Sequence, residues 1–176
     1  MKDKRGIVMV YTGNGKGKTT AALGLGLRAV GHNEKVYMIQ FMKGDETYGE
    51  VQAVKKYLPG FELVQKGLDA FVKKGDPSPE DLKLAKEGME LAKKVISEGN
   101  YNLVILDEIN VAMDYGLVSE KDVLDLISIK PDFVTLVLTG RYASEKIIEI
   151  ADMVSEVKEI KHHYRDGIPA QSGIEF

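Results

Sequence analysis

The stretch IVMVYTGNGKGKTT at residues 7–20 joins a short apolar run to a loop rich in glycine and lysine. The apolar run at 7–11 predicts a buried strand, and TTAALGLGLRAV at 19–30 predicts a helix. Glycines between them allow backbone N–H groups to turn inward around an anion, and the positive end of the following helix points to the same place. The order of strand, glycine-rich loop and helix therefore predicts a phosphate-binding loop.

This loop departs from the strict Walker A pattern, which asks for a glycine, four residues and then Gly-Lys-Ser/Thr. Gly17, Lys18 and Thr19 fit the end of the pattern. Thr12 occupies the first glycine position, and Gly13 comes one place later. A lysine there supplies positive charge to a terminal phosphate, and the threonine hydroxyl suits Mg²⁺. The competing interpretation is a glycine-rich turn with solvated lysines, which the strand and helix on either side disfavour.

Apolar runs of strand length alternate with longer stretches of helical period along the rest of the chain. After the first run, strands are predicted at 36–41, 62–65, 103–107, 133–139 and 154–158. The clearest helix is predicted at 79–97, capped by Ser78, and another follows Ser119 and ends before Pro131. This alternation is typical of βαβ units on a parallel sheet. We therefore expect one α/β domain over residues 1–176, a three-layer P-loop NTPase-like fold with a mainly parallel sheet flanked by helices.

Ligands in open α/β sheets bind at the carboxyl ends of the strands, so the loops there are the ones that bear on function. The acidic pair Asp107 and Glu108 directly follows the apolar run LVIL, as a Walker B pair follows its strand. Such carboxylates hold Mg²⁺ directly or through water; the alternative is an acidic pair that faces solvent. Arg141 follows the next apolar strand, where it either meets phosphate or lies in a surface turn. The least regular stretches are predicted at 43–50, 66–78 and 161–176.

Composition excludes several other kinds of site. The chain has a net charge of −3 and no cysteine, which rules out disulfides, thiolate nucleophiles and Cys-ligated metal centres. The histidines are His32, His162 and His163, without an HExxH pairing. Long basic runs and apolar spans of membrane length are absent from the sequence, and the first apolar run is too short for a signal peptide. We therefore expect a cytoplasmic protein that binds neither nucleic acid nor membrane.

These features predict a nucleotide bound with Mg²⁺, but the same cradle serves kinases, ATPases and switches. Further motifs are GNGKGKTTAA at 13–22, RAVGHN at 28–33, QFMKG at 40–44, VILDE at 104–108, LTGR at 138–141 and IKHHYRDGIPAQSGIEF at 160–176. Together they resemble the ATP:corrinoid adenosyltransferases, more narrowly the P-loop family that adenosylates cob(I)alamin and cob(I)yrinic acid a,c-diamide. The resemblance runs from about residue 6 to the C-terminus in the family's order and spacing, and the Thr12 departure belongs to the family's own variant.

The resemblance implies an unusual bond cleavage. In this family, Co(I) of a reduced corrinoid attacks the 5′ carbon of ATP and expels inorganic triphosphate. The nucleotide lies reversed relative to ordinary P-loop enzymes, so the loop grips the γ-phosphate end. Lys18, the loop amides, Mg²⁺ and Lys16 would then face the growing charge of the leaving group. Because Co(I) needs no activating base, Glu108 is better interpreted as a Mg²⁺ ligand than as a water-orienting group.

The resemblance also assigns site residues. The catalytic residues are Lys18 and Glu108. The nucleotide-binding residues are Gly13, Asn14, Gly15, Lys16, Gly17, Lys18, Thr19, Thr20 and Arg28. The metal ligands are Thr19, Asp107 and Glu108. A solvated position on its helix is an equally good interpretation of Arg28.

The resemblance implies that the loop at 66–78 and the tail at 160–176 face the corrinoid. Relatives place aromatic residues in that loop to exclude the lower cobalt ligand; here Phe71 is its aromatic residue, and the chain has no tryptophan. A core-facing role for Phe71 is the alternative. His162 and His163 are interpreted as orienting the tail or a corrinoid side chain, because the reaction needs the lower nitrogen ligand removed.

The implied partners are ATP, a reduced corrinoid such as cobalamin or cobyrinic acid diamide, and an electron-donating reductase. A homodimer is also implied. The activity would serve adenosylcobalamin synthesis or salvage. The alternative hypothesis is a P-loop ATPase or an ATP-binding regulatory module that keeps the cradle without corrinoid chemistry.

Overall fold

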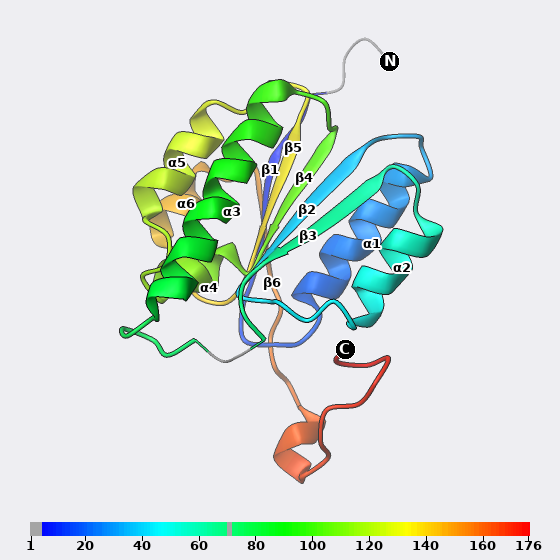
Figure 1. Ribbon diagram of the computed structural model, residues 1–176, viewed down its shortest axis with the longest axis vertical. Helices are drawn as coiled ribbons and strands as arrows, with labels where there is room; N and C mark the ends of the chain where they lie inside the picture. The colour runs from blue at the N-terminus through cyan, green and yellow to red at the C-terminus, as the bar shows by residue number, and fades with distance from the viewer. Residues whose placement is uncertain (1–4, 70–71) are drawn as a thin grey trace.

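The computed structural model describes residues 5–69 and 72–176. Within these ranges, a six-stranded sheet with the order β3-β2-β4-β5-β1-β6 forms the centre of the molecule (Figure 1). The strands are β1 (Val8–Thr12), β2 (Val36–Phe41), β3 (Phe61–Lys66), β4 (Leu103–Asp107), β5 (Thr135–Thr139) and β6 (Met153–Glu156). Every neighbouring pair is parallel. The carboxyl ends of the strands therefore meet at one edge of the sheet, where the glycine-rich loop follows β1.

Helices cover both faces of the sheet (Figure 1). One face carries α1 (Lys18–Val30) and α2 (Gly49–Tyr57). The other carries α3 (Pro79–Glu98), α4 (Ile109–Asp114), α5 (Glu120–Ser128) and α6 (Glu145–Ile150). A tail with the 3₁₀ turn η1 (His163–Asp166) follows β6 and extends beyond the carboxyl edge. This arrangement confirms the predicted three-layer α/β fold with a parallel sheet. In the described part of the chain, no helix combines the length and apolarity that a membrane crossing requires.

Strand β4 shows why the central strands are almost continuously apolar in sequence. Successive side chains of a strand point to opposite faces. Leu103 and Ile105 pack on the face of α1 and α2, whereas Val104 and Leu106 pack on the face of α3. Because helices cover both faces, neither set of side chains meets water. The strand is thus fixed in position, and with it the acidic pair at its carboxyl end.

Leu106→Ala is expected to lower the free energy of unfolding by about 2–5 kcal/mol, because it leaves a cavity at a fully buried position. Leu27 on α1 is 56 % exposed, so Leu27→Ala is a matched control. Its effect should stay within about 0.5 kcal/mol. Urea unfolding followed by circular dichroism measures both variants. Equal losses in the two would contradict the placement of β4 in the core.

The predicted start of α3 and its Ser78 cap are confirmed, and the helix ends at Glu98, one residue after the predicted end. The Ser78 hydroxyl accepts from the backbone N–H of Asp81 at 3.1 Å, and the Asp81 carboxylate accepts from the backbone N–H of Ser78 at 3.0 Å. This reciprocal capping box satisfies N–H groups that the first helical turn leaves without partners. Gly99 ends the helix with a φ of 64°, in the left-handed region that glycine adopts without a steric penalty.

The structure contains three helices that the sequence did not predict. Helix α2 begins inside the stretch 43–50, which was expected to be irregular; its N-cap Tyr48 makes no side-chain cap, and its buried position is Val54 alone. Helices α4 and α6 have six residues each, too few for a helical period to show in the sequence. Two strand ends differ from the expectation by two residues, and the ends of β1 and β3 and the start of β6 differ by one. β5 begins at Thr135 because Phe133 lies in an exposed turn, and β6 ends at Glu156, two residues before the predicted end.

Candidate nucleotide and metal site

A cleft of about 520 Å³ opens at the carboxyl edge of the sheet, where α/β folds bind ligands. The glycine-rich loop, the start of α1 and the C-terminal tail all line it. Its ionisable side chains come from separate elements of the fold. They are Lys16, Lys18, Lys43, Glu50, Glu108, Arg141, His162 and Glu175. The cleft therefore brings four cationic side chains and three carboxylates together around the predicted phosphate loop.

The loop conformation depends on its glycines. Gly13 has a φ of 94° and Gly17 a φ of 116°, both in the region that side chains with a Cβ rarely adopt. A Cβ on Gly13 would lie 2.4 Å from the carbonyl oxygen of Val157. The backbone N–H of Gly15 donates to that same oxygen at 2.8 Å. The segment after β6 thus packs against one side of the loop, and the loop also lines the cleft.

Lys18 lies folded into this loop. Its ammonium donates to the carbonyl oxygens of Gly13 and Gly15, each at 2.8 Å, and the residue is only 7 % exposed. Burial lowers the pKa of Lys18, and the nearby charge of Glu108 acts in the opposite direction. The ammonium is therefore held at the centre of the loop, where a terminal phosphate would meet it at little reorganisation cost.

Asp107 is fully buried and forms the centre of a polar network. Its carboxylate accepts hydrogen bonds from Thr19 Oγ1 at 2.9 Å, Thr139 Oγ1 at 2.6 Å, Gln40 Nε2 at 3.2 Å and Lys43 Nζ at 2.9 Å. The fold thus brings Thr19 and Asp107 together, as the resemblance implies. Because the Thr19 hydroxyl donates its one proton to Asp107, its oxygen lone pairs remain free to coordinate a cation.

Glu108 has a different position from its neighbour. It caps α4 in the left-handed conformation, with a φ of 60°, and its backbone N–H donates to Thr139 Oγ1 at 2.9 Å. This turn sends the Glu108 side chain to the wall of the cleft, whereas Asp107 stays inside. Burial raises the pKa of Glu108, and the adjacent charge of Asp107 raises it further. A cation in the cleft would relieve this electrostatic cost.

The donor set fits magnesium bound together with a nucleotide. Among the described residues, no group of three or more His, Asp or Glu side chains is arranged to hold a metal by itself. Mg²⁺ in nucleotide sites takes one or two carboxylates and completes its octahedron with water and substrate phosphates. The hydroxyl of Thr19 and the carboxylate of Glu108 line the cleft beside the phosphate loop, and Asp107 lies buried behind Thr19; these are oxygen donors of the kind that would suit Mg²⁺.

Sequence reasoning missed part of this network. Gln40 and Lys43 belong to the motif QFMKG, and Thr139 to LTGR, but none of the three received a role. All three lie at or just beyond the carboxyl end of a strand that adjoins β4. That position was the signal that could have identified them. Arg141, expected to meet phosphate or lie in a turn, lines the cleft.

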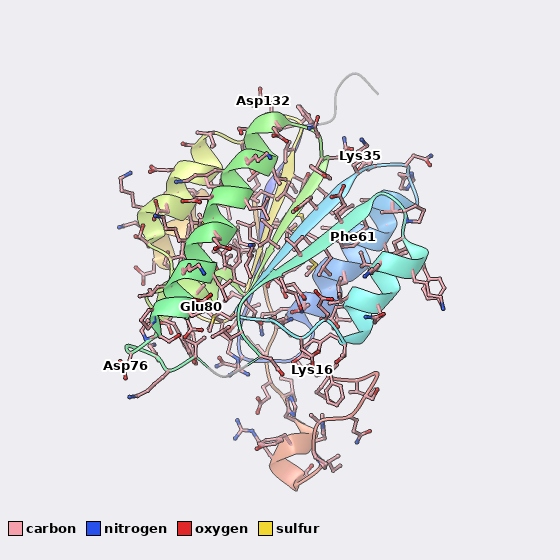
Figure 2. The ribbon with its side chains drawn as sticks, in the orientation of Figure 1. Lys16, Lys35, Phe61, Asp76, Glu80 and Asp132 are labelled. Carbon is pink, nitrogen blue, oxygen red and sulfur yellow. The ribbon has the colours of Figure 1, made fainter. Side chains whose placement is uncertain are left out.

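The C-terminal tail folds back over the phosphate loop. Glu175 Oε1 lies 3.4 Å from Lys16 Nζ and 3.5 Å from His163 Nε2. In Figure 2, Lys16 lies where the body of the molecule meets the tail. The ring of Phe176 lies 6.3 Å from that of Tyr48, measured between centroids. The tail motif is therefore part of the nucleotide cleft.

Some of the predicted residues lie elsewhere. Arg28 is exposed in the last turn of α1, about 15 Å along the helix axis from Lys18, and lines a separate cavity near the amino ends of the strands. Asn14 is exposed and lines a polar cleft that shares Arg141 with the main one. Thr20 lines the main cleft. Phe71 lies outside the described residues.

Similarity to a solved structure bears on the fold alone. The KaiC-like protein PH0186 from Pyrococcus horikoshii OT3 superposes with a TM-score of 0.58 at 19% identity, over 88% of this chain and 73% of that one.

Sequence relatives bear on the family. The profile of the ATP:corrinoid adenosyltransferases BtuR/CobO/CobP matches residues 4–176. The corrinoid adenosyltransferase of Escherichia coli K12 is 35% identical over 99% of this chain and 88% of that protein. The Sinorhizobium sp. enzyme is 36% identical over 99% of this chain and 82% of its own length. Corrinoid adenosyltransferase CobA of Salmonella typhimurium is 33% identical over 99% and 88%. With this match over nearly its whole length, the chain belongs to the ATP:corrinoid adenosyltransferase family.

Proposed function

We propose that the protein is a transferase that moves the 5′-deoxyadenosyl group of ATP to Co(I) of a reduced corrinoid and releases triphosphate. The observation that supports this most directly is the match to corrinoid adenosyltransferases over residues 4–176, in a chain whose cleft surrounds a phosphate loop with Lys16, Lys18, Lys43 and Arg141. These cations suit a triphosphate that gains charge as it leaves.

The reaction balances without a proton transfer. An electron pair of Co(I) forms the cobalt–carbon bond at C5′, and the electrons of the C5′–O bond leave with the triphosphate. Lys18 and the loop amides bind the γ-phosphate end, so C5′ points away from the loop toward the mouth of the cleft. Lys16 and Arg141 add positive charge along the leaving group. Bound Mg²⁺ would neutralise part of the triphosphate charge, held by Thr19, Asp107 and Glu108.

A catalytic base has no task in this scheme, because the attacking cobalt carries no proton to be removed. Glu108 therefore serves as a metal ligand in the proposal. Arg28 is left out of the triphosphate cradle, since it lies on the far turn of α1. The corrinoid would approach over the loop at 66–78 and the tail at 160–176. We further propose that Co(I) comes from an electron-donating reductase, that the active form is a homodimer and that the enzyme works in the cytoplasm.

Incubation with ATP, Mg²⁺ and chemically reduced cobalamin tests the proposal. We expect a light-sensitive adenosylcorrinoid by absorbance and triphosphate as the phosphate product by chromatography, both dependent on corrinoid. ADP and phosphate formed without corrinoid would indicate the ATPase alternative and reject the transferase. The names of the curated relatives do not favour that alternative.

A further inference from the structure

The motif QFMKG places two side chains on one oxygen of the buried metal-site carboxylate. Asp107 Oδ2 accepts from Gln40 Nε2 at 3.2 Å and from Lys43 Nζ at 2.9 Å. The other oxygen, Oδ1, accepts from the hydroxyls of Thr19 and Thr139. Lys43 is thus the cation nearest to this carboxylate among the described ion pairs, and it also lines the nucleotide cleft.

The backbone holds Lys43 in this position. Directly after β2, Met42 adopts a φ of 59°, which turns the chain back over the carboxyl edge of the sheet. Gly67 packs against this turn so closely that a Cβ there would lie 2.3 Å from the backbone nitrogen of Lys43. A non-glycine residue in the left-handed region carries a conformational cost that the surrounding structure must offset. The position of the ammonium is therefore built into the fold.

Two carboxylates lie close to the Lys43 ammonium. The Lys43 side chain is 20 % exposed, and its Nζ lies 3.9 Å from Glu50 Oε1. Gln40 Nε2 donates to both carboxylates, at 3.3 Å to Glu50 and 3.2 Å to Asp107. The 2.9 Å ion pair with Asp107 therefore places the ammonium directly against Oδ2 of that carboxylate.

We propose that Lys43 acts as a counter-cation of Asp107 and weakens the binding of free divalent cations at this carboxylate. When the metal enters with nucleotide phosphates, Lys43 leaves Asp107 and the metal can bind there. Phosphates entering the cleft offer the ammonium a new anionic partner, so Lys43 can move from the carboxylate to the triphosphate without losing its charge compensation. A free cation brings no such partner, so at Asp107 Oδ2 it meets the repulsion of the ammonium. Lys43 is a positioning residue in this account, which rests on the proposed magnesium site.

Mn²⁺ binding to the nucleotide-free protein, followed by the electron paramagnetic resonance signal of free Mn²⁺, tests the inference. Lys43→Met removes the charge and keeps the length of the side chain. We expect this variant to bind Mn²⁺ at least about tenfold more tightly than the wild type, because a like charge beside the site is gone. Adding Asp107→Asn to Lys43→Met should abolish the gain. Lys43→Arg, which retains the charge, should behave as the wild type.

Lys146→Met is the matched control, since Lys146 forms a 2.8 Å ion pair with Glu120 outside the cleft. It should leave Mn²⁺ binding unchanged. If Lys43→Met does not fold, as judged by circular dichroism, Lys43→Gln removes the charge while keeping a donor for Asp107. Unchanged Mn²⁺ affinity after loss of the charge would overturn the inference, as would an equal gain in Lys43→Arg. Adenosyl transfer by the wild type is a separate measurement, so the proposed function can stand while this inference fails.

Discussion

Lys18→Ala is expected to lower the rate of adenosyl transfer at saturating ATP by about 10²–10³-fold or more. The ammonium lies at the centre of the loop, 2.8 Å from the carbonyl oxygens of Gly13 and Gly15, where the triphosphate would gain charge as C5′–O breaks. Alanine removes that charge from the leaving group and leaves the loop glycines in place. Steady-state formation of adenosylcobalamin, with chemically reduced cobalamin in excess, measures the effect.

Lys83→Ala is the control for Lys18→Ala. Lys83 is an exposed lysine on α3 whose partner is Glu80, at 3.2 Å within the same helix. Its removal should leave the rate unchanged and stability nearly so. Circular dichroism should show a folded Lys18→Ala protein, because the hydrogen bonds of this side chain go to the loop carbonyls of Gly13 and Gly15. A folded Lys18→Ala that transfers at the wild-type rate would show that the phosphate loop is misassigned.

Asp107→Asn is expected to cost about 3–5 kcal/mol in the free energy of unfolding. The carboxylate is fully buried and pairs with Lys43 at 2.9 Å, so its neutralisation leaves the lysine charge without its closest partner. Thr19, Thr139 and Gln40 all donate hydrogen bonds to the carboxylate. The amide N–H₂ of asparagine is itself a donor, so one of these groups would face another donor in place of an acceptor. Urea unfolding of the variant and the wild type measures the loss.

Asp125→Asn offers the comparison for an exposed pair. Asp125 is 52% exposed in its side chain and pairs with Lys121 one helical turn away, so its neutralisation should cost no more than about 1 kcal/mol. Combining Asp107→Asn with Lys43→Met should recover part of the larger loss, because both partners of the buried pair are then neutral. A loss for Asp107→Asn no greater than that for Asp125→Asn would contradict the buried network.

The sequence predicted those elements whose hydrophobic pattern and end residues match the surroundings that they have in the fold. Strand β4 is apolar throughout because both of its faces are covered, and α3 carries Ser78 and Gly99 at its ends. Helix α4 could not be found this way, since six residues give no period and its N-cap is Glu108 in a left-handed turn. That turn is also what separates a buried Asp107 from a cleft-lining Glu108, although the two are neighbours in sequence.

The site could be predicted only in part, because only some of its residues lie in one contiguous segment. A phosphate loop is a contiguous segment, so Lys18 and Thr19 were found from their spacing. The network around Asp107 is assembled across neighbouring strands, and the contact of Lys43 depends on the turn at Met42. The return of Glu175 to Lys16 also depends on the path of a tail without hydrophobic period. Contacts of this kind follow from tertiary structure and leave no local pattern.

The proposed transfer requires that the bond broken in ATP is the one between C5′ and its oxygen. ATP carrying ¹⁸O in the bridge between C5′ and the α-phosphorus tests this directly, in a reaction with Mg²⁺ and reduced cobalamin. Mass spectrometry of the products should find the label in inorganic triphosphate, with none retained by the adenosyl group on cobalt. Label that stays with the adenosine portion, or leaves in ADP beside unlabelled phosphate, would contradict the account.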